Sequence, residues 1–228
     1  MKTQINPIGE SVRRILDTVP PGVSLLAAAK TRSLEEVEAV IEAGVTHIGY
    51  NYIQESLPII HTIGNQVTWH MIGHLQQNKT KIAVENFDII ETVDSWRLAQ
   101  TLDRFCSAIG KKMPVLIEIN SGREENKTGV LPERVDELVN QISSLQNIHV
   151  EGLMTMGPRF GNPEDSRPYF QITRSVYEHL AQLNLPNVDM RMLSMGMSNS
   201  YKIAIEEGAN IVRIGTKLFG ERSQKGEI

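Results

Sequence analysis

The feature that most constrains the fold of this chain is a regular alternation of short apolar runs with segments of helical pattern. Each run except the last is followed by a segment whose apolar residues recur at helical spacing. The eight runs are residues 23–29, 46–49, 67–72, 87–93, 113–119, 148–154, 188–193 and 210–214. Strict alternation of this kind implies parallel strands joined by helices. Eight such units within 228 residues predict an α/β fold, a closed (β/α)8 TIM barrel near the small end of its size range.

The remaining segments complete this expectation. Helical spacing over residues 5–18 predicts an extra helix before the first strand, and Pro20-Pro21-Gly22 ends it. The helices after the strands are expected at 33–43, 52–61, 75–84, 95–109, 132–144, 166–183 and 201–207. An open doubly wound sheet is the runner-up, but no glycine-rich dinucleotide fingerprint follows any strand. We expect a single domain over residues 1–228, with a lead-in helix in 1–22 and a polar tail in 221–228.

The charge and the single cysteine exclude several classes of function. A net charge of -4 is mildly acidic and argues against a broad nucleic-acid or membrane surface. The N-terminal segment has no apolar signal core, and no apolar run is long enough to span a bilayer. We therefore expect a cytoplasmic protein. Cys106 is the only cysteine, so neither a disulfide framework nor a thiolate metal cluster is expected.

A lysine stands at the end of the first apolar run, Val23-Ser-Leu-Leu-Ala-Ala-Ala-Lys30. Burying a lone ammonium group is costly, so Lys30 has two interpretations at the end of a buried strand. In the first, its side chain snorkels to water. In the second, it lies in a partly desolvated pocket with a lowered pKa, where it can form a Schiff base with a carbonyl compound.

The other strand ends narrow the chemistry, because active residues of such barrels lie at the C-terminal ends of the strands. These ends supply one amine nucleophile, and Asp94 is the one carboxylate near the rim. This set disfavours metal-assisted hydrolysis and two-carboxylate acid–base chemistry. We expect no metal site.

The last two strands end in loops rich in glycine and hydroxyl groups, Leu193-Ser-Met-Gly-Met-Ser-Asn-Ser200 and Arg213-Ile-Gly-Thr216. Backbone N–H groups of such loops can approach an anion closely, and barrel enzymes often bind phosphate there. The alternative is that Ser198 only caps a short helix and that the glycines only turn the chain. Together with Lys30, the two loops favour a carbonyl compound that carries a phosphate. Pyridoxal 5'-phosphate (PLP) has both groups.

A series of short motifs carries a resemblance to a known family. The motifs are Ala29-Lys-Thr, Gly49-x-Asn-Tyr-x-Gln-Glu55, Trp69-His-x-Ile-Gly73, Leu75-Gln-x-Asn-Lys79, Lys127-x-Gly129, Gly152-Leu-Met154, Leu193-Ser-Met-Gly-Met-Ser198 and Arg213-Ile-Gly-x-x-x-Phe-Gly220. In order and spacing they closely resemble the pyridoxal-phosphate homeostasis proteins. Members of that family look like the barrel domain of fold-type III PLP enzymes, such as alanine racemase, without the second domain.

The resemblance implies roles for the residues that match. Lys30 matches the lysine that forms the Schiff base, and Arg213 matches the arginine that faces the pyridine nitrogen. The phosphate cradle is matched by Ser198, Gly215 and Thr216, with Ser194 beside it. A permanent guanidinium cannot accept the pyridinium proton, so the ring stays a weak electron sink and strong carbanion chemistry is disfavoured.

Three further residues match the family. Asn51 and Lys127 each have two interpretations, and Met154 has a supporting role. Asn51 touches the ring hydroxyl of the cofactor or bonds only to loop backbone. Met154 is expected to pack near the ring without reacting. Lys127 matches a family lysine thought to handle or release the cofactor, or it is a solvated loop lysine.

The sequence also departs from the family at two places. Tyr50 replaces a glutamate that commonly precedes the Asn-Tyr pair, so any role of that carboxylate is absent. Asn199-Ser200 stands where acidic residues are usual, which changes the charge near the phosphate loop without removing its donors.

The resemblance therefore implies a PLP-binding protein for intracellular PLP homeostasis. It holds PLP on Lys30 and buffers it or delivers it to apo-PLP enzymes, with no robust catalytic activity and no catalytic residue assigned. The alternative is a low-activity amino-acid racemase or decarboxylase of fold-type III, although the chain has no room for the second domain of those enzymes. A third hypothesis is a barrel that binds a phosphorylated metabolite non-covalently. We expect a monomer with no nucleic-acid or membrane partner.

Overall fold

Eight parallel strands form a closed barrel in the order of the sequence, and β8 pairs with β1 to close it. The computed structural model describes residues 7–158 and 161–221. The strands are β1 (Ser24–Ala28), β2 (His47–Tyr50), β3 (Thr68–Met71), β4 (Ile89–Val93), β5 (Met113–Ile119), β6 (Ile148–Thr155), β7 (Val188–Ser194) and β8 (Ile211–Ile214). The predicted (β/α)8 barrel is thus confirmed, and the open sheet is excluded.

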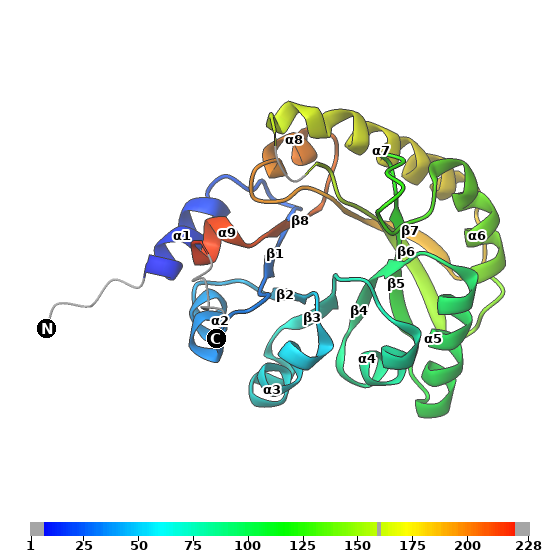
Figure 1. The fold of residues 1–228 in the computed structure, drawn as a ribbon, viewed down its shortest axis with the longest axis horizontal. Helices are drawn as coiled ribbons and strands as arrows, with labels where there is room; N and C mark the ends of the chain where they lie inside the picture. Colours follow the sequence, from blue (N-terminus) through cyan, green and yellow to red (C-terminus); the bar gives the residue numbers. More distant parts are fainter. Residues whose placement is uncertain (1–6, 159–160, 222–228) are drawn as a thin grey trace, which may run out of the picture.

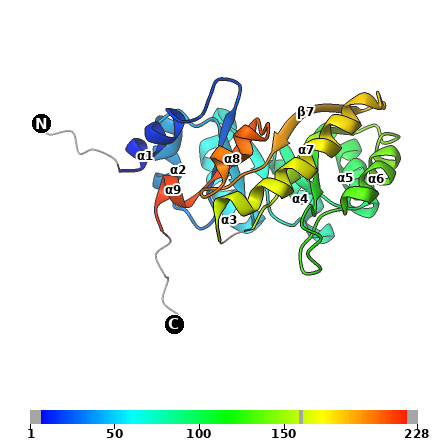
Figure 2. The same ribbon diagram turned by 90° about the horizontal axis from the view of Figure 1, so that it is seen from above.

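An α-helix follows every strand and covers the outside of the barrel (Figure 1). These helices are α2 (Leu34–Glu42), α3 (Ile53–Ile63), α4 (Thr80–Asn86), α5 (Trp96–Ile109), α6 (Val135–Ile142), α7 (Arg167–Gln182), α8 (Tyr201–Glu206) and α9 (Thr216–Phe219). The extra helix α1 (Pro7–Leu16) lies beside α2 and α9, at the side of the barrel where β1 and β8 meet. Figure 2 shows α7 running along the outside of the barrel, where it packs on β6 and β7.

Most helix bounds agree with expectation to within about two residues, but the predicted helix over 75–84 begins too early. The structure has a short 3-10 turn at Gln77–Lys79, and α4 starts only at Thr80. The chain crosses the rim of the barrel before this point, where Gly73 lies against the backbone of Asn51. A Cβ atom on Gly73 would lie 2.3 Å from the carbonyl oxygen of Asn51. Residues 5–6 of the first predicted helix and 222–228 of the polar tail lie outside the described residues.

The apolar core lies mainly between the barrel and the helices. Leu26, Ile72 and Ile211 form a second, small apolar cluster that is separate from this core. Several buried polar side chains lie in the interior of the barrel: His70, Glu91, Ser194 and Arg213. This differs from the usual interior of such barrels, which is filled by branched aliphatic side chains.

Within the described ranges, no helix combines the length and the hydropathy needed to cross a membrane.

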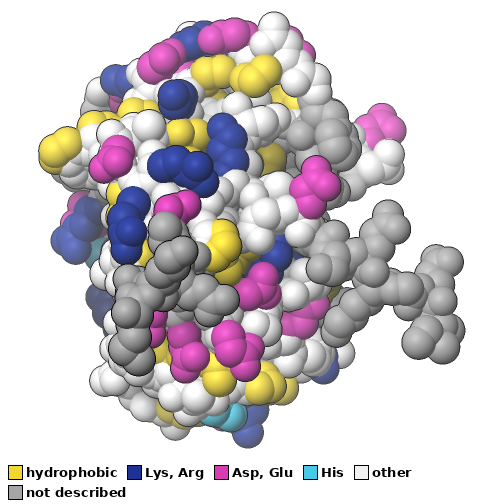
Figure 3. All heavy atoms as spheres, turned by 90° about the vertical axis from the view of Figure 1, so that its left-hand side faces the viewer, with side chains coloured by type: hydrophobic (Ala, Val, Ile, Leu, Met, Phe, Trp, Pro, Cys, Tyr) yellow, Lys and Arg dark blue, Asp and Glu magenta, His cyan; other side chains and the backbone are white. Residues whose placement is uncertain are grey.

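The surface over α1, α2 and α9 shows basic and acidic side chains interspersed with apolar ones (Figure 3). Helix α2 alone carries Glu35, Glu36, Glu38 and Glu42, while Arg13 and Arg14 lie on α1. Mixed charge on this face agrees with the mildly acidic composition of the chain. It does not test the expectation that nucleic acid is not a partner.

Candidate functional site

A cavity of about 490 Å³ opens at the C-terminal ends of β1 and β8. Its wall combines a primary amine, a buried guanidinium and a loop of small and hydroxylic residues. The lining residues are Ala28, Lys30, Arg32, Asn51, Ile72, Met156, Met197, Ser198, Asn199, Arg213, Gly215 and Thr216. The structure therefore brings together six predicted residues that lie as far as 186 positions apart in the chain (216 minus 30).

Lys30 lies half-buried in the turn after β1. The next residue, Thr31, has a φ of 64°, a left-handed conformation that is an outlier for a β-branched residue. Two contacts hold this turn in place. The Thr31 backbone N–H donates to Glu55 Oε2 at 3.1 Å, and the Ala29 N–H donates to the Gly49 carbonyl oxygen at 2.9 Å. The amine is thus positioned by a strained turn that α3 and β2 clamp.

Arg32 connects the same turn to the residues at the end of α9. Its guanidinium donates to the carbonyl oxygens of Phe219 and Gly220 at 3.3 and 2.7 Å, and it forms an ion pair with Glu36 at 3.0 Å. These bonds connect the loop of Lys30 to α9, the helix that begins at Thr216. Arg32 had no predicted role, although it stands only two residues from Lys30.

The loop after β7 faces the start of α9. The Ser198 hydroxyl accepts a hydrogen bond from the backbone N–H of Lys217 at 3.4 Å. Gly196 has a φ of 90°, and a Cβ there would lie 2.5 Å from Ala204 Cβ, so this turn requires glycine. The alternative in which Ser198 caps α8 is wrong, because the residue at the start of that helix is Ser200, which makes no side-chain cap bond.

A chain of hydrogen-bonded side chains crosses the interior of the barrel below the cavity. Arg213 donates from Nη1 to Ser194 Oγ at 2.7 Å, and Ser194 Oγ donates to Glu91 Oε2 at 2.6 Å. On the other side, Glu91 Oε1 lies 2.6 Å from His70 Nδ1, and His70 Nε2 lies 3.0 Å from His47 Nδ1. The second terminal nitrogen of Arg213 donates to the Thr155 carbonyl oxygen at 2.8 Å.

This series of hydrogen-bonded side chains holds opposite charges in the interior of the barrel. Burial opposes ionisation of Glu91, but the hydrogen bonds and charges of His70, Arg213 and Ser194 outweigh it and hold the pKa of Glu91 below its usual value. Burial lowers the pKa of the Arg213 guanidinium, and the charge of Glu91 opposes this shift. The guanidinium remains charged, because arginine does not deprotonate in proteins.

At its far end this series of side chains ends at a neutral imidazole. Burial and the neighbouring His70 lower the pKa of His47 to about 4, and Glu91 only partly opposes the shift. His47 is half-buried at the first residue of β2, away from the strand ends that form the cavity.

The structure leaves three predicted residues outside the cavity. Ser194 and Met154 are fully buried and paired with each other across β6 and β7, and the Ser194 hydroxyl bonds to Arg213 and Glu91. Lys127 lies in the loop after β5, where its amine is 2.5 Å from Glu124 Oε1. Met156, two residues beyond Met154, lines the cavity instead. Its position one residue beyond the C-terminal end of β6, at the rim where such barrels bind ligands, was the signal that could have identified it.

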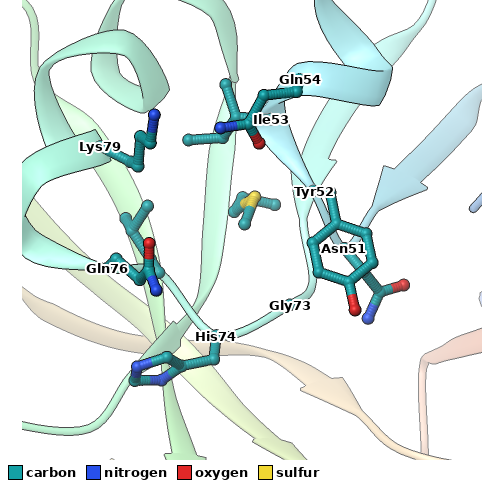
Figure 4. Close-up of a pocket in the computed structure, with 10 residues that line it drawn as sticks. Asn51, Tyr52, Ile53, Gln54, Gly73, His74, Gln76 and Lys79 are labelled. Carbon is teal, nitrogen blue, oxygen red and sulfur yellow. The ribbon is translucent and has the colours of Figure 1, made fainter.

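A smaller cavity of about 290 Å³ adjoins this site, and Asn51 lines both. Figure 4 shows Tyr52 and Asn51 side by side at its edge, with Lys79 and Gln76 on the opposite wall. No group of three or more metal-binding side chains occurs within residues 7–158 and 161–221.

Comparison with known proteins places this geometry in a family. The model of the alanine racemase N-terminal domain family matches residues 6–223. A pyridoxal phosphate homeostasis protein from Aquifex aeolicus is 42% identical, over 87% of this chain and 86% of its own. The solved structure of PipY from Synechococcus elongatus with PLP bound has a TM-score of 0.85 and 32% identity, and it covers 93% of this chain and all of its own.

Alanine racemase from Clostridium difficile shares the fold. Its TM-score is 0.78 at 16% identity, and the match covers 96% of this chain and 60% of the racemase. The chain therefore belongs to the pyridoxal phosphate homeostasis protein family, which is built on the alanine racemase N-terminal domain.

Proposed function

We propose that this protein binds PLP in the cavity at the end of β1, holds it as a Schiff base on Lys30, and so buffers PLP or delivers it to apo-enzymes. The observation that supports this most directly is the cavity itself. It places the amine of Lys30, the guanidinium of Arg213 and the Ser198–Thr216 donors around one space. No part of the proposal requires a metal.

The chemistry of the lining residues fits PLP. Bound PLP supplies an aldehyde, and Lys30 offers the primary amine that reacts with it. The hydroxyl of Ser198 and the backbone N–H groups around Gly215 and Thr216 are donors suited to a phosphate group. Arg213, fixed by Ser194 and Thr155, is a permanent cation that would face the ring nitrogen of bound PLP and keep a proton off it.

A carrier role agrees with the relatives better than a racemase role does. The Aquifex aeolicus relative, at 42% identity, is named for PLP homeostasis and not for a reaction, and PipY has been solved with and without PLP. The expectation of no robust catalytic activity is in line with this name. The racemase or decarboxylase alternative rests on the fold alone, at 16% identity.

Four finer statements belong to the same proposal. We propose a single PLP-binding domain over 1–228, a monomeric state, a cytoplasmic location and apo-PLP enzymes as recipients. Lys127 remains a candidate second residue for handling PLP. Its position outside the cavity, paired with Glu124, suits a step of entry or release better than the Schiff base itself.

The test is the visible absorption spectrum of the purified protein with PLP, before and after borohydride, followed by peptide mass mapping. We expect a Schiff-base band that disappears on reduction, with the added mass on Lys30. Lys30→Ala should abolish both signals, whereas Lys127→Ala should keep them. A wild-type protein that stays unlabelled would refute the proposal.

Racemisation assays on several amino acids separate the carrier from the enzyme. We expect no turnover above that of Lys30→Ala. Robust turnover that depends on Lys30 would instead favour the racemase alternative.

A further inference from the structure

The amine of Lys30 has one close hydroxyl neighbour. Lys30 Nζ donates to the hydroxyl of Tyr52 at 3.3 Å and lies 4.6 Å from the centre of the same ring. Among residues 7–158 and 161–221, no carboxylate forms an ion pair with this amine, and Tyr52 is its only hydrogen-bond partner. The reactive group thus faces a single side chain that can both donate and accept a proton.

The backbone on both sides maintains this approach. Tyr52 is the residue before α3, with an extended φ of -130° and ψ of 126°. Glu55 in the first turn of α3 accepts from the Thr31 N–H, and Gly49 accepts from the Ala29 N–H. The segments that carry the amine and the hydroxyl are therefore bonded to each other on either side of the pair.

Tyr52 also stands at a place suited to proton exchange. Its side chain is 50% exposed, although exposing a large aromatic ring gains no burial energy. It lines the smaller cavity beside the site, next to Asn51, which lines both cavities (Figure 4). A hydroxyl in this position contacts the amine on one side and water on the other.

We propose that the Tyr52 hydroxyl is the acid–base group for the formation and hydrolysis of the Schiff base on Lys30; this inference rests on the proposed function. In formation, the neutral amine of Lys30 makes a double bond to the aldehyde carbon, and both bonds from that carbon to its oxygen break. The oxygen leaves as water and takes both amine protons. Tyr52 gives its own proton to the departing oxygen and recovers one from Nζ, so it ends unchanged.

The proposal predicts a change in rates without a change in affinity, because an acid–base catalyst accelerates both directions equally. Tyr52→Phe keeps the ring beside Lys30 and removes only the hydroxyl. General acid–base catalysis typically contributes about 10²–10⁴-fold, and water can partly replace an exposed hydroxyl, so we expect formation and release to slow by about tenfold or more. The dissociation constant of PLP should stay the same.

The experiment mixes purified protein with PLP in a stopped-flow instrument and follows the Schiff-base absorption, then follows release into excess competing amine. Tyr169→Phe is the matched control, because Tyr169 contacts the Gly122 turn and, unlike Tyr52, lines neither of the two cavities. Borohydride trapping and mass mapping on each variant show where PLP is attached.

The two failures are distinguishable. Wild-type protein that traps no PLP on Lys30 would refute both the proposed function and this inference. Trapping on Lys30 with wild-type rates in Tyr52→Phe would overturn this inference alone. Faster release with weaker affinity in Tyr52→Phe would also overturn it, because Tyr52 would then act only as a contact that retains PLP.

Discussion

At the scale of single residues, the site depends on backbone and charge states that are costly elsewhere. Thr31 holds a left-handed backbone next to Lys30, and its side chain is exposed. Strain of this kind persists where surrounding contacts impose it, and here Glu55 and Arg32 supply those contacts. His47 is likewise kept neutral by burial and by its neighbour His70.

Replacing Thr31 by glycine should stabilise the protein. Glycine adopts a left-handed backbone without the steric cost of about 1–2 kcal/mol, although it loses more entropy on folding, so we expect a gain of up to about 1 kcal/mol. Urea unfolding of Thr31→Gly measures this. Thr46→Gly, at an exposed position without a positive φ, is the control and should destabilise. A loss of stability in both variants would show that the Thr31 backbone is not strained.

The buried imidazole of His47 should make stability depend on pH. Its pKa is lowered from 6.5 to about 4 in the folded state, so the unfolded state binds more protons between these values. The free energy of unfolding therefore falls as the pH decreases from 6.5 to about 4. His47→Gln should lose less stability over this range than the wild type does. Parallel stability–pH curves from urea titrations would contradict the assignment.

At the scale of elements, the start of α2 fixes the end of the loop that carries Lys30. The Ser33 hydroxyl accepts from the Glu36 N–H at 3.3 Å, and Glu36 Oε2 accepts from the Ser33 N–H at 2.8 Å. The two bonds form the capping box that is typical of a Ser-x-x-Glu pattern at the start of a helix. By contrast, Ser95 precedes α5 without a side-chain cap bond.

The two serines form a matched pair for testing the cap. Ser33→Ala should cost about 1 kcal/mol, because it leaves a backbone N–H of α2 unpaired. Ser95→Ala should change stability by less than about 0.5 kcal/mol. Both values come from urea unfolding. Equal effects would mean that the Ser33 bond contributes nothing to stability.

At the scale of the whole molecule, the barrel interior is organised around opposite charges. Arg213 and Glu91 lie 3.9 Å apart on β8 and β4, with Ser194 of β7 bonded to both. Because the two strands lie on different sides of the barrel, the ion pair ties its halves together beneath the cavity. Losing one member would leave the other charged and buried.

Glu91→Gln should therefore lower the free energy of unfolding more than most substitutions do. Breaking a buried ion pair at one partner costs about 3–5 kcal/mol, although the amide oxygen of the substituted side chain can still accept the hydrogen bond from Ser194, which reduces this toward the lower end. Glu178→Gln, which breaks the exposed pair with Arg174, is the control and should cost at most about 1 kcal/mol. Urea unfolding curves measure both. Similar losses of stability in the two variants would show that Glu91 is not charged in the folded protein.

Much of the fold was predictable because hydrophobic periodicity and cap chemistry are local. The strand runs, the Ser33 capping box and the stop at Gly110 after α5 all depend on residues close in sequence. The start of α4 was not predictable, because the pattern from residue 75 onward gives no sign of the 3-10 turn at Gln77–Lys79 that precedes the helix. The role of Ser198 was open because its partner, the Lys217 N–H in α9, is distant in the sequence.

The sequence by itself determined the alternation of strands and helices, and therefore which residues lie at the strand ends. It also identified Lys30 and the two loops that now line one cavity. Only the tertiary structure decided that Ser194 bonds beneath Arg213, that Arg32 joins the wall and that Tyr52 faces the amine. Closing the barrel brings β1 against β8 and β2, and these contacts between distant segments leave no local pattern in the sequence.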